Sequence, residues 1–217
     1  MEKIKLAVLI SGRGSNLQSL IHACQEPTYP AEIAIVISNK ADAKGLIHAT
    51  DADLPIKIIN QRNFNSLHEL DRHMTEVLTN AGVQLICLAG FMQVLSSHFV
   101  HHWWNKIINI HPSLLPSFKG LNVQSRAIAS GARFSGCTIH YVREGVDEGP
   151  IICQAVVPIL DEDDTDTLAS RILEQEHRLY PAAVRWIATG QIRIVKEIVH
   201  IKDAIYPNTV LVNPIPI

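Results

Sequence analysis

The chain has 217 residues, of which 47% are hydrophobic and 18% are charged, and its formal net charge at pH 7 is -2. This length is enough for one α/β core and too short for two independent domains, so we predict a single domain over residues 1–195 and a C-terminal tail over residues 196–217. Because the small net charge supplies no field that would hold a polyanion, we expect no nucleic-acid partner.

The first apolar run, over residues 4–11, predicts a strand and leads into a glycine-rich turn without the cleavage pattern of a signal peptide. No stretch approaches the roughly 20 apolar residues of a membrane span. We therefore predict a cytoplasmic protein with no membrane partner. The four cysteines are spaced too widely for a zinc site or a compact disulfide frame, and they predict buried free thiols.

Short β-branched or aliphatic runs alternate with stretches that can form helices through the first half of the chain. The predicted strands cover residues 4–11, 32–38, 56–60, 85–89 and 106–111, and the predicted helices cover residues 16–23, 43–49 and 66–81. This alternation predicts βαβ units, and hence an α/β fold with a Rossmann-like, mostly parallel twisted sheet that has helices on both faces.

The pattern changes in the second half of the chain. Residues 134–142 and 151–157 flank the loop 143–150, and this spacing permits two antiparallel strands. A long helix is predicted over residues 167–188, with a kink or break at Pro181. The remainder, from Ile192 onward, has strand-like pieces and a proline-rich end. We therefore expect an antiparallel addition to the sheet in the C-terminal half.

The turn after the first strand reads Ser-Gly-Arg-Gly-Ser-Asn over residues 11–16. Backbone N–H groups at the start of a helix can bind a phosphate. The turn lacks the Lys-Ser/Thr ending of a P-loop and the third glycine of a dinucleotide motif, so a monophosphate ester fits best. Alternatively, the two glycines only form a tight turn, with Ser15 or Asn16 as the N-cap.

The fifth predicted strand ends in Asn-Ile-His-Pro-Ser-Leu-Leu-Pro, residues 109–116. Alternation along the strand places Asn109 and His111 on one face, and the two prolines and the serine stiffen the turn that follows. An amide donor beside a titratable imidazole is typical of a site that stabilises an oxyanion and moves a proton. The alternative is a buried amide and a core histidine, both bonded to the backbone.

Asp147 lies in the loop 143–150 and by itself reads as a turn residue. Close to His111, however, its carboxylate would favour the imidazolium form and fix the ring, which would make a proton carrier near neutral pH. The sequence alone leaves these two interpretations open.

Three other groups of residues have a simpler interpretation. His98, His101 and His102 have helical spacing but lack a further ligand, so they predict a surface cluster and not a metal site. Glu176, on the predicted long helix, is expected on a solvated face. Residues 91–95 could form a hydrophobic plug under a loop, or an apolar wall for a flat ring.

Taken together, six segments resemble the folate-dependent phosphoribosylglycinamide formyltransferases of purine biosynthesis. The segments are residues 10–16, 38–43, 88–92, 109–116, 147–150 and 175–177, and the resemblance extends over about residues 4–190. Residues 109–116 are shared with other formyltransferases and specify the chemistry. The loop 11–16 narrows the acceptor to a ribonucleotide, and we expect no appended domain of the kind found in formyltransferases that act on tRNA.

The resemblance implies transfer of the formyl group from N10-formyltetrahydrofolate to the amine of glycinamide ribonucleotide, without a metal, by a monomer or homodimer. It assigns catalysis to Asn109, His111 and Asp147. It also implies that Glu176 meets the ammonium or ribose end of the ribonucleotide. The residues implied to hold the substrate phosphate are Gly14, Ser15 and Asn16.

For the folate, the resemblance implies that two segments of the chain flank the pterin and that Asn109 contacts it. The pterin is expected against Met92, Gln93, Val94 and Leu95, and its edge against the backbone of Arg143, Glu144, Gly145, Val146 and Asp147. The chain departs from the family at Gln93, Gln124 and Leu67, where the family often has arginine, histidine and a folate-tail arginine. Arg62 or Arg72 could replace the last of these.

Two other functions are compatible with parts of this sequence. Formyl transfer to an amino sugar nucleotide would use the same motif at residues 109–116. A ribonucleotide-binding sensor without catalysis would keep the phosphate turn, although binding alone gives no reason for a proton carrier beside an oxyanion donor.

Overall fold

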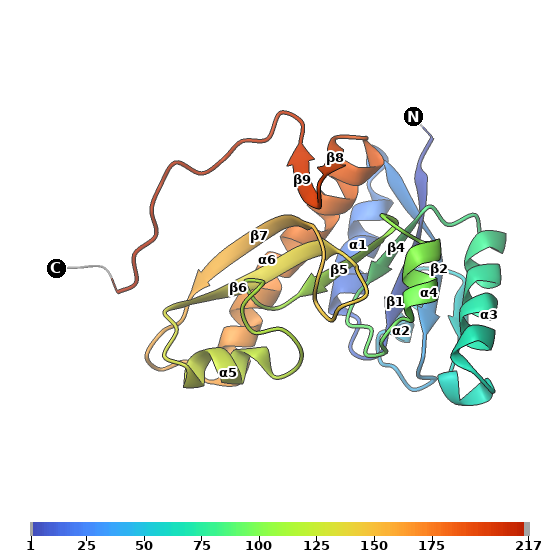
Figure 1. Cartoon of the computed structure of the whole chain (residues 1–217), viewed down its shortest axis with the longest axis horizontal. Helices are drawn as coiled ribbons and strands as arrows, with labels where there is room; N and C mark the ends of the chain where they lie inside the picture. Colours follow the sequence, from blue (N-terminus) through green and yellow to red (C-terminus); the bar gives the residue numbers. More distant parts are fainter. Residues whose placement is uncertain (1, 215–217) are drawn as a thin grey trace.

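The computed structural model, which describes residues 2–214, is organised around a seven-stranded sheet in the order β3-β2-β1-β4-β5-β6-β7 (Figure 1). Its strands are β1 (Ile4–Ile10), β2 (Ala31–Ser38), β3 (Ile56–Ile58), β4 (Leu85–Leu88), β5 (Ile107–His111), β6 (Phe134–Tyr141) and β7 (Ile151–Pro158). The strands β1 to β5 are parallel, whereas β6 and β7 are antiparallel to their neighbours. The predicted mostly parallel sheet with an antiparallel addition is confirmed.

Helices cover both faces of this sheet (Figure 1). They are α1 (Ser15–Gln25), α2 (Leu46–Asp51), the 3₁₀ turn η1 (Gln61–Asn63), α3 (Leu67–Asn80), α4 (Ser97–His102), α5 (Val123–Ala129) and α6 (Thr165–Ala188). One face packs against α1 and α6, and the other packs against α3 and α4.

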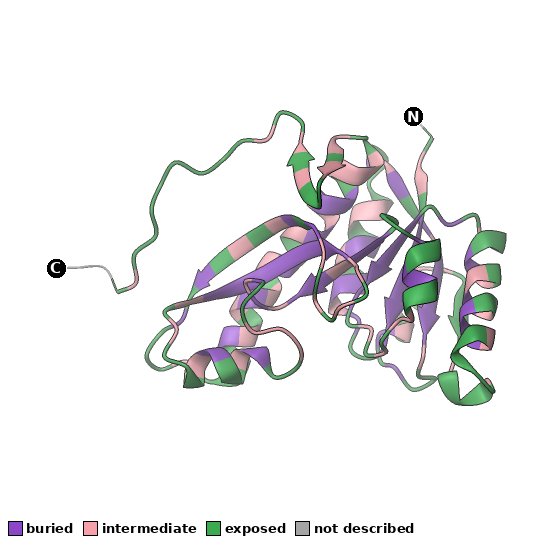
Figure 2. Cartoon of the chain, viewed as in Figure 1, coloured by how far each residue is buried: buried purple, intermediate pink, exposed green. Residues whose placement is uncertain are grey.

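Alternation along β1 explains this two-sided burial. Leu6 and Val8 belong to the core cluster that contains residues of α1 and α6, whereas Ala7 and Leu9 belong to the cluster with residues of α3 and α4. Because both faces are covered, β1 reads as a continuous apolar run and is buried along most of its length (Figure 2).

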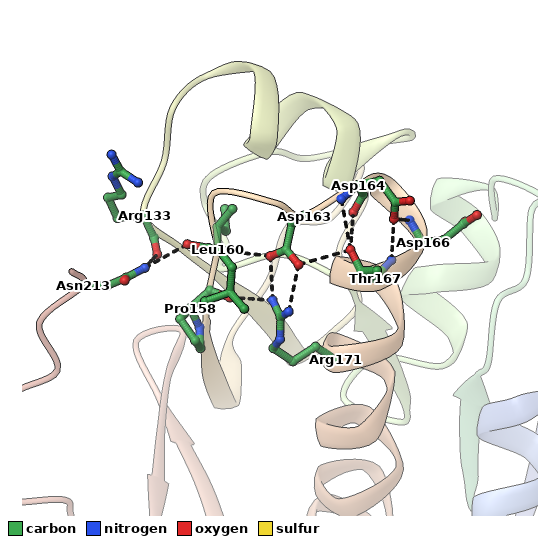
Figure 3. A network of polar contacts seen from close by, with 10 residues as sticks. Arg133, Pro158, Leu160, Asp163, Asp164, Asp166, Thr167, Arg171 and Asn213 are labelled. Atoms are coloured by element: carbon green, nitrogen blue, oxygen red, sulfur yellow. Dashed lines mark hydrogen bonds and ion pairs between the residues drawn. The ribbon is translucent and has the colours of Figure 1, made fainter. Parts of the chain in front are cut away.

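The observed helices differ from the predicted ones in two places. The helix predicted over residues 43–49 begins at Leu46, after a turn. Of the kink or break predicted at Pro181, the break is wrong, because α6 continues through this residue. Tertiary contacts hold this part of the helix: buried Tyr180 donates its hydroxyl to the carbonyl oxygens of Leu88 and Ile108, and Tyr29 donates to the carbonyl of Pro181. The first turn of α6 is capped by Asp164 (Figure 3).

The short helices α4 and α5 are not predicted from the sequence pattern. These helices have only six and seven residues, so each presents fewer than two repeats of the apolar positions that mark a helical face.

The C-terminal part of the chain begins with the hairpin of β8 (Ile192–Val195) and β9 (Ile198–Ile201). The predicted domain boundary after residue 195 falls in the turn of this hairpin, and side chains of both strands pack against the core cluster beside α1 and α6. Residues 204–212 form no helix or strand and extend from the body as an arm (Figure 1).

The cysteines of residues 2–214 form no disulfide bond. All four cysteines are free: Cys87 and Cys137 are buried, and Cys24 and Cys153 are partly buried. Burial raises the pKa of each thiol, which suits an inert packing role. None of the helices in this range has the length and apolar character needed to cross a membrane.

The strand order reverses direction between β1 and β4. From β1 the chain moves to β2 on one side, and β4 then pairs with β1 on the other side. In open α/β sheets, ligands bind at the carboxyl ends of the strands beside such a reversal. The turn after β1, the segment after β4 and the end of β5 all lie at this edge.

Candidate active site

Asn109 and His111, on β5, converge with Asp147 from the loop between β6 and β7. Asp147 Oδ2 lies 3.3 Å from His111 Nδ1, and Asp147 Oδ1 lies 3.5 Å from Asn109 Nδ2. The side chains of His111 and Asp147 are 7% and 11% exposed. The alternation along the strand therefore correctly predicts that Asn109 and His111 face the same side, and the contact with Asp147 is direct.

Both ring nitrogens of His111 face oxygen acceptors. Besides the Asp147 carboxylate at Nδ1, the carbonyl oxygen of Phe118 lies 3.0 Å from Nε2. A carboxylate and a carbonyl can only accept, so the imidazolium form alone satisfies both contacts. The geometry therefore favours a cationic ring beside a buried carboxylate, which is the arrangement of a proton carrier.

The carboxylate of Asp147 is fixed by backbone groups of two loops. Gly120 donates its N–H to Asp147 Oδ2 at 2.7 Å, and the loop that holds Asp147 is closed by a bond of 3.1 Å from Arg143 N–H to the carbonyl of Glu148. Asp147 itself has a left-handed backbone, with φ of 51°. It is thus a turn residue, as its sequence context indicates, and also part of the site.

His140, on β6, is a member of the site that the sequence pattern does not predict. Its Nδ1 lies 2.9 Å from the carbonyl of Tyr141 and must therefore carry a proton, while its Nε2 lies 3.2 Å from Asn109 Nδ2. Burial lowers the pKa of His140 and so favours the neutral ring, whose Nε2 accepts from the Asn109 amide. His140 thereby orients Asn109 and leaves the amide's second N–H in only the long contact with Asp147.

The turn after β1 has the tight backbone that its two glycines predict. Gly14, with φ of 72°, occupies the N-cap position of α1, and a Cβ added there would lie 2.6 Å from Gly45 Cα. The interpretation of Ser15 or Asn16 as the N-cap is wrong, because α1 begins at Ser15 and has no side-chain cap. The N–H groups of the first turn of α1 have no partner within the helix and lie at its positive end. This end of α1 is suited to an anion.

Asn16 and Glu176 meet beside this turn. Asn16 Nδ2 donates to Glu176 Oε2 at 2.7 Å, and both residues are buried. The expectation that Glu176 lies on a solvated face is therefore wrong. Burial raises the pKa of Glu176. Asn16 Oδ1 is buried and accepts no hydrogen bond within residues 2–214, so the pair offers oxygens to a ligand that carries N–H or O–H groups.

Ser11 joins this turn to the segment after β4. Its N–H donates to the carbonyl of Gly90, and its hydroxyl accepts from Met92 N–H at 2.8 Å and donates to Asn39 Oδ1. The side chains of Met92 and Val94 are exposed, while those of Gln93 and Leu95 are partly buried. An exposed apolar surface therefore lies next to the turn, as the interpretation of this segment as a wall requires.

The side chain of Arg143 lies outside the catalytic cluster and pairs with Glu197. Its backbone N–H is used inside the loop by Glu148, and the Glu144 side chain pairs with His101 at 3.3 Å. The N–H of Arg143 is therefore not available to a pterin. Backbone contacts of a pterin with the other residues of 143–147 stay a prediction.

Within residues 2–214, no three or more His, Cys, Asp or Glu side chains lie together in a way that could hold a metal ion. His98, His101 and His102 are exposed on α4, as the prediction of a surface cluster requires.

Comparisons with known proteins agree on one family. A family model described as formyl transferase matches residues 4–184. The chain is 43% identical over 209 residues to the phosphoribosylglycinamide formyltransferase of Haemophilus influenzae, which covers 96% of this chain and 99% of that protein. The crystal structure of glycinamide ribonucleotide transformylase 1 from Symbiobacterium toebii matches with a TM-score of 0.90 at 44% identity, covering 93% of this chain and 95% of that one.

A third relative is much longer than this chain. The chain is 48% identical over 192 residues to the trifunctional purine biosynthetic protein adenosine-3 of Gallus gallus, and the match covers 88% of this chain but only 19% of that protein.

Proposed function

The chain belongs to the formyl transferase family, and we propose that it transfers the formyl group of N10-formyltetrahydrofolate to the amine of glycinamide ribonucleotide. The products are N-formylglycinamide ribonucleotide and tetrahydrofolate, in the biosynthesis of purines. The similarity over nearly the whole length of a relative named for this activity supports the choice of acceptor. The observation that carries the chemistry is the 3.3 Å contact of His111 with Asp147 beside Asn109.

Attack of the amine on the formyl carbon produces a tetrahedral intermediate with a negative oxygen. Asn109 and the cationic His111 are the donors that we assign to this oxygen. His140 holds the Asn109 amide at one hydrogen, so the N–H in the long 3.5 Å contact with Asp147 is the one available to the oxyanion. A donor of this kind contributes about 3 kcal/mol to the stability of the transition state.

Collapse of the intermediate requires two proton movements. The attacking nitrogen loses a proton and the folate nitrogen gains one. Asp147 holds Nδ1 of His111, so Nε2 is the nitrogen that we assign to the reacting atoms, and the substrates displace the Phe118 carbonyl from it. The cationic His111, held by Asp147, first gives its Nε2 proton to the folate nitrogen. The neutral ring then takes up the proton that the attacking nitrogen loses, so His111 ends in the form in which it began.

The two substrates occupy neighbouring parts of the same sheet edge in this proposal. Gly14, Ser15 and Asn16 bind the phosphate of the ribonucleotide at the start of α1, and Glu176 binds its glycinamide or ribose end. The pterin lies against the segment from Met92 to Leu95, which Ser11 links to the phosphate turn. The formyl group then reaches the catalytic residues between them.

We also propose a cytoplasmic location, in keeping with the free state of all four cysteines. A monomeric or homodimeric state stays a prediction.

The proposal is tested by incubating the purified chain with N10-formyltetrahydrofolate, with and without glycinamide ribonucleotide. We expect tetrahydrofolate to form only when the ribonucleotide is present. Release without the ribonucleotide would indicate hydrolysis, and release that depends instead on an amino sugar nucleotide would identify a different acceptor. Either result would overturn the proposed function.

A further inference from the structure

The Arg143 side chain is a meeting point of three segments that are far apart in the sequence. Its Nε and Nη2 donate to the two carboxylate oxygens of Glu197 at 2.6 and 3.1 Å. Its Nη2 also donates to Asn105 Oδ1 at 2.8 Å, and its Nη1 donates to the carbonyl of Val142 at 3.0 Å. The guanidinium lies 3.8 Å from the centre of the Trp104 ring. Every nitrogen of the guanidinium group is therefore bonded, and its position is fixed by Trp104 and Asn105, in the turn after α4, and by the β8–β9 turn.

Glu197, the partner in this ion pair, lies in a hairpin that packs on the core. It sits in the turn of the β8–β9 hairpin with φ of 61°, and four side chains of the hairpin pack against the core cluster next to α1 and α6. These are Ile192, Ile194, Val199 and Ile201. The Arg143 guanidinium lowers the pKa of Glu197, which keeps this residue a carboxylate near neutral pH. A two-pronged contact between arginine and carboxylate fixes direction as well as distance.

Arg143 also lies against both ends of the loop that holds Asp147. At the start of the loop, its own N–H closes the backbone onto Glu148. At the end of the loop, a Cβ added to Gly149 would lie 2.0 Å from the Tyr141 carbonyl and 3.0 Å from Arg143 Cγ, so Gly149 leaves no room for a side chain between itself, Tyr141 and the arginine stem. A displaced Arg143 would therefore shift the whole loop.

We propose that Glu197 is a positioning residue for formyl transfer: through Arg143 it fixes the loop 143–149 so that Asp147 stays in contact with His111. This inference rests on the proposed function. Glu197 contacts neither His111 nor Asp147 and acts only through the arginine. The Asp147 to His111 contact is already 3.3 Å long, and a displacement of about 1 Å at a catalytic group can reduce a rate by about a hundredfold.

The test compares two substitutions in the same turn. Glu197→Gln removes the charge of the ion pair, whereas Lys196→Gln removes a neighbouring exposed charge at a residue that has the same left-handed backbone. We expect Glu197→Gln to lower kcat by about three- to tenfold, since an exposed pair contributes modestly. The KM for the ribonucleotide should stay unchanged, because its proposed binding residues lie on α1 and α6. Lys196→Gln should change neither value.

A double variant of Arg143 and Glu197 distinguishes a positioning role of Glu197 from a general loss of stability. Arg143→Met already removes the ion pair, so we expect the double variant Arg143→Met/Glu197→Gln to have the kcat of Arg143→Met alone. Hydrogen exchange of the amides of residues 144–149 should become faster in Glu197→Gln and not in Lys196→Gln. This second measurement does not depend on activity.

The outcomes distinguish this inference from the proposed function. If formyl transfer occurs and Glu197→Gln matches Lys196→Gln in kcat, or if the two substitutions in the double variant reduce kcat independently, the inference is overturned. If the unaltered chain transfers no formyl group, the proposed function fails, and hydrogen exchange alone tests whether Glu197 fixes the loop 143–149. Faster exchange in Glu197→Gln would support this role of Glu197, and unchanged exchange would overturn it.

Discussion

His111 and Asn109 are each held by a neighbour that determines which of their hydrogens can act. His140 occupies one N–H of the Asn109 amide, and Asp147 and the Phe118 carbonyl occupy the two nitrogens of His111. The site is thus a set of oriented donors around a carboxylate and not a loose group of polar side chains. Orientation of this kind limits the rearrangement that the donors need before they stabilise a developing charge, which for His111 is the displacement of the Phe118 carbonyl.

Removal of either central donor should abolish most of the activity. We expect Asn109→Ala and His111→Ala each to lower kcat by about a hundredfold or more, because oxyanion donors and proton carriers typically contribute this much. His102→Ala, which removes an exposed ring on α4, is the control and should leave kcat unchanged. Steady-state kinetics on folded protein, checked by circular dichroism, measures the effect. Rates near that of the unaltered chain in both variants would remove the mechanism.

The phosphate turn allows a matched pair of glycine substitutions. Gly14 has φ of 72° and nearly touches Gly45, whereas a Cβ added to Gly12 meets no atom within 4 Å. We expect Gly14→Ala to lose at least about 1 kcal/mol of stability from the left-handed backbone alone. It should also raise the KM for the ribonucleotide about tenfold or more, with little effect on the KM for the folate. Gly12→Ala should behave like the unaltered chain, and equal effects of the two substitutions would contradict this account of the turn.

The sequence was informative about single residues where a local rule applies. Alternation along β5 is enough to place Asn109 and His111 together. The role of His140 was not predictable, because it depends on the antiparallel register that sets it opposite Asn109. The expectation of a solvated Glu176 fails because helical periodicity does not show that the α6 face carrying it is covered by α1.

Helix α6 is the element that ties the substrate site to the rest of the fold. Its first turn is held by Asp164, whose side chain accepts from the N–H groups of Asp166 and Thr167 (Figure 3). One turn further, Arg171 makes a two-pronged ion pair with Asp163 at 2.7 and 2.8 Å. Glu176 follows in the middle of the helix. The position of Glu176 therefore depends on a helix fixed at its start by charged groups.

The Asp163 ion pair predicts a pH dependence of stability. Arg171 holds the pKa of Asp163 well below its usual range. Because the pKa is lower in the folded state, the stabilisation is complete above the unfolded value of about 4 and is lost as the pH falls through the folded pKa. We expect Asp163→Asn to lower the free energy of unfolding at pH 7 by about 2 kcal/mol, the contribution of a hydrogen bond to a charged group, and to flatten its decline below about pH 4. Urea unfolding between pH 2.5 and 7 provides the measurement.

Asp161→Asn is the control for this prediction. The side chain of Asp161 is 84% exposed in its pair with Arg133, compared with 3% for Asp163. A surface pair contributes about 0 to 1 kcal/mol, so this substitution should have little effect at any pH. If the free energy of unfolding falls in parallel with pH in the unaltered chain and in Asp163→Asn, the pH dependence does not come from the Asp163 ion pair.

At the scale of elements, long periodic segments were predictable and short ones were not. The stripe of Leu70, Met74 and Leu78 marks α3 clearly, and all three side chains are buried. In α4 and α5 the apolar positions are too few to form a stripe. Pro181 was judged by its missing N–H, but the buried Tyr180 next to it keeps α6 continuous.

Across the whole molecule, the two parts of the C-terminal region differ in how they pack on the body of the protein. The hairpin packs on the core and supplies Glu197, whereas Ile205, Tyr206 and Val210 of the arm are exposed. The arm returns to the body through Asn213, whose amide donates to the carbonyls of Arg133 and Ile159 (Figure 3). The two parts of the C-terminal region should therefore be separable by truncation.

Removal of residues 204–217 should leave kcat and both KM values unchanged. We expect a loss of about 1 to 2 kcal/mol in the free energy of unfolding, the value of the two Asn213 hydrogen bonds. Removal of residues 192–217 should in addition lower kcat, because it deletes Glu197 and uncovers the core cluster beneath the hairpin. Activity assays and urea unfolding of both shortened chains test this. A large loss of activity in the first would show that the arm has a role that its contacts do not explain.

The close approach of Gly14 to Gly45 links the first two crossovers, which a 2.8 Å bond from Gly45 N–H to the Gly12 carbonyl also joins. A Cβ at Gly45 would lie 2.7 Å from Gly14 Cα, as close as in the reverse case. Neither position can gain a side chain while the other backbone stays in place. A chimera that joins the first βα unit of this chain to the second unit of a distant homologue will therefore assemble only if the donor also contributes a glycine at the facing position.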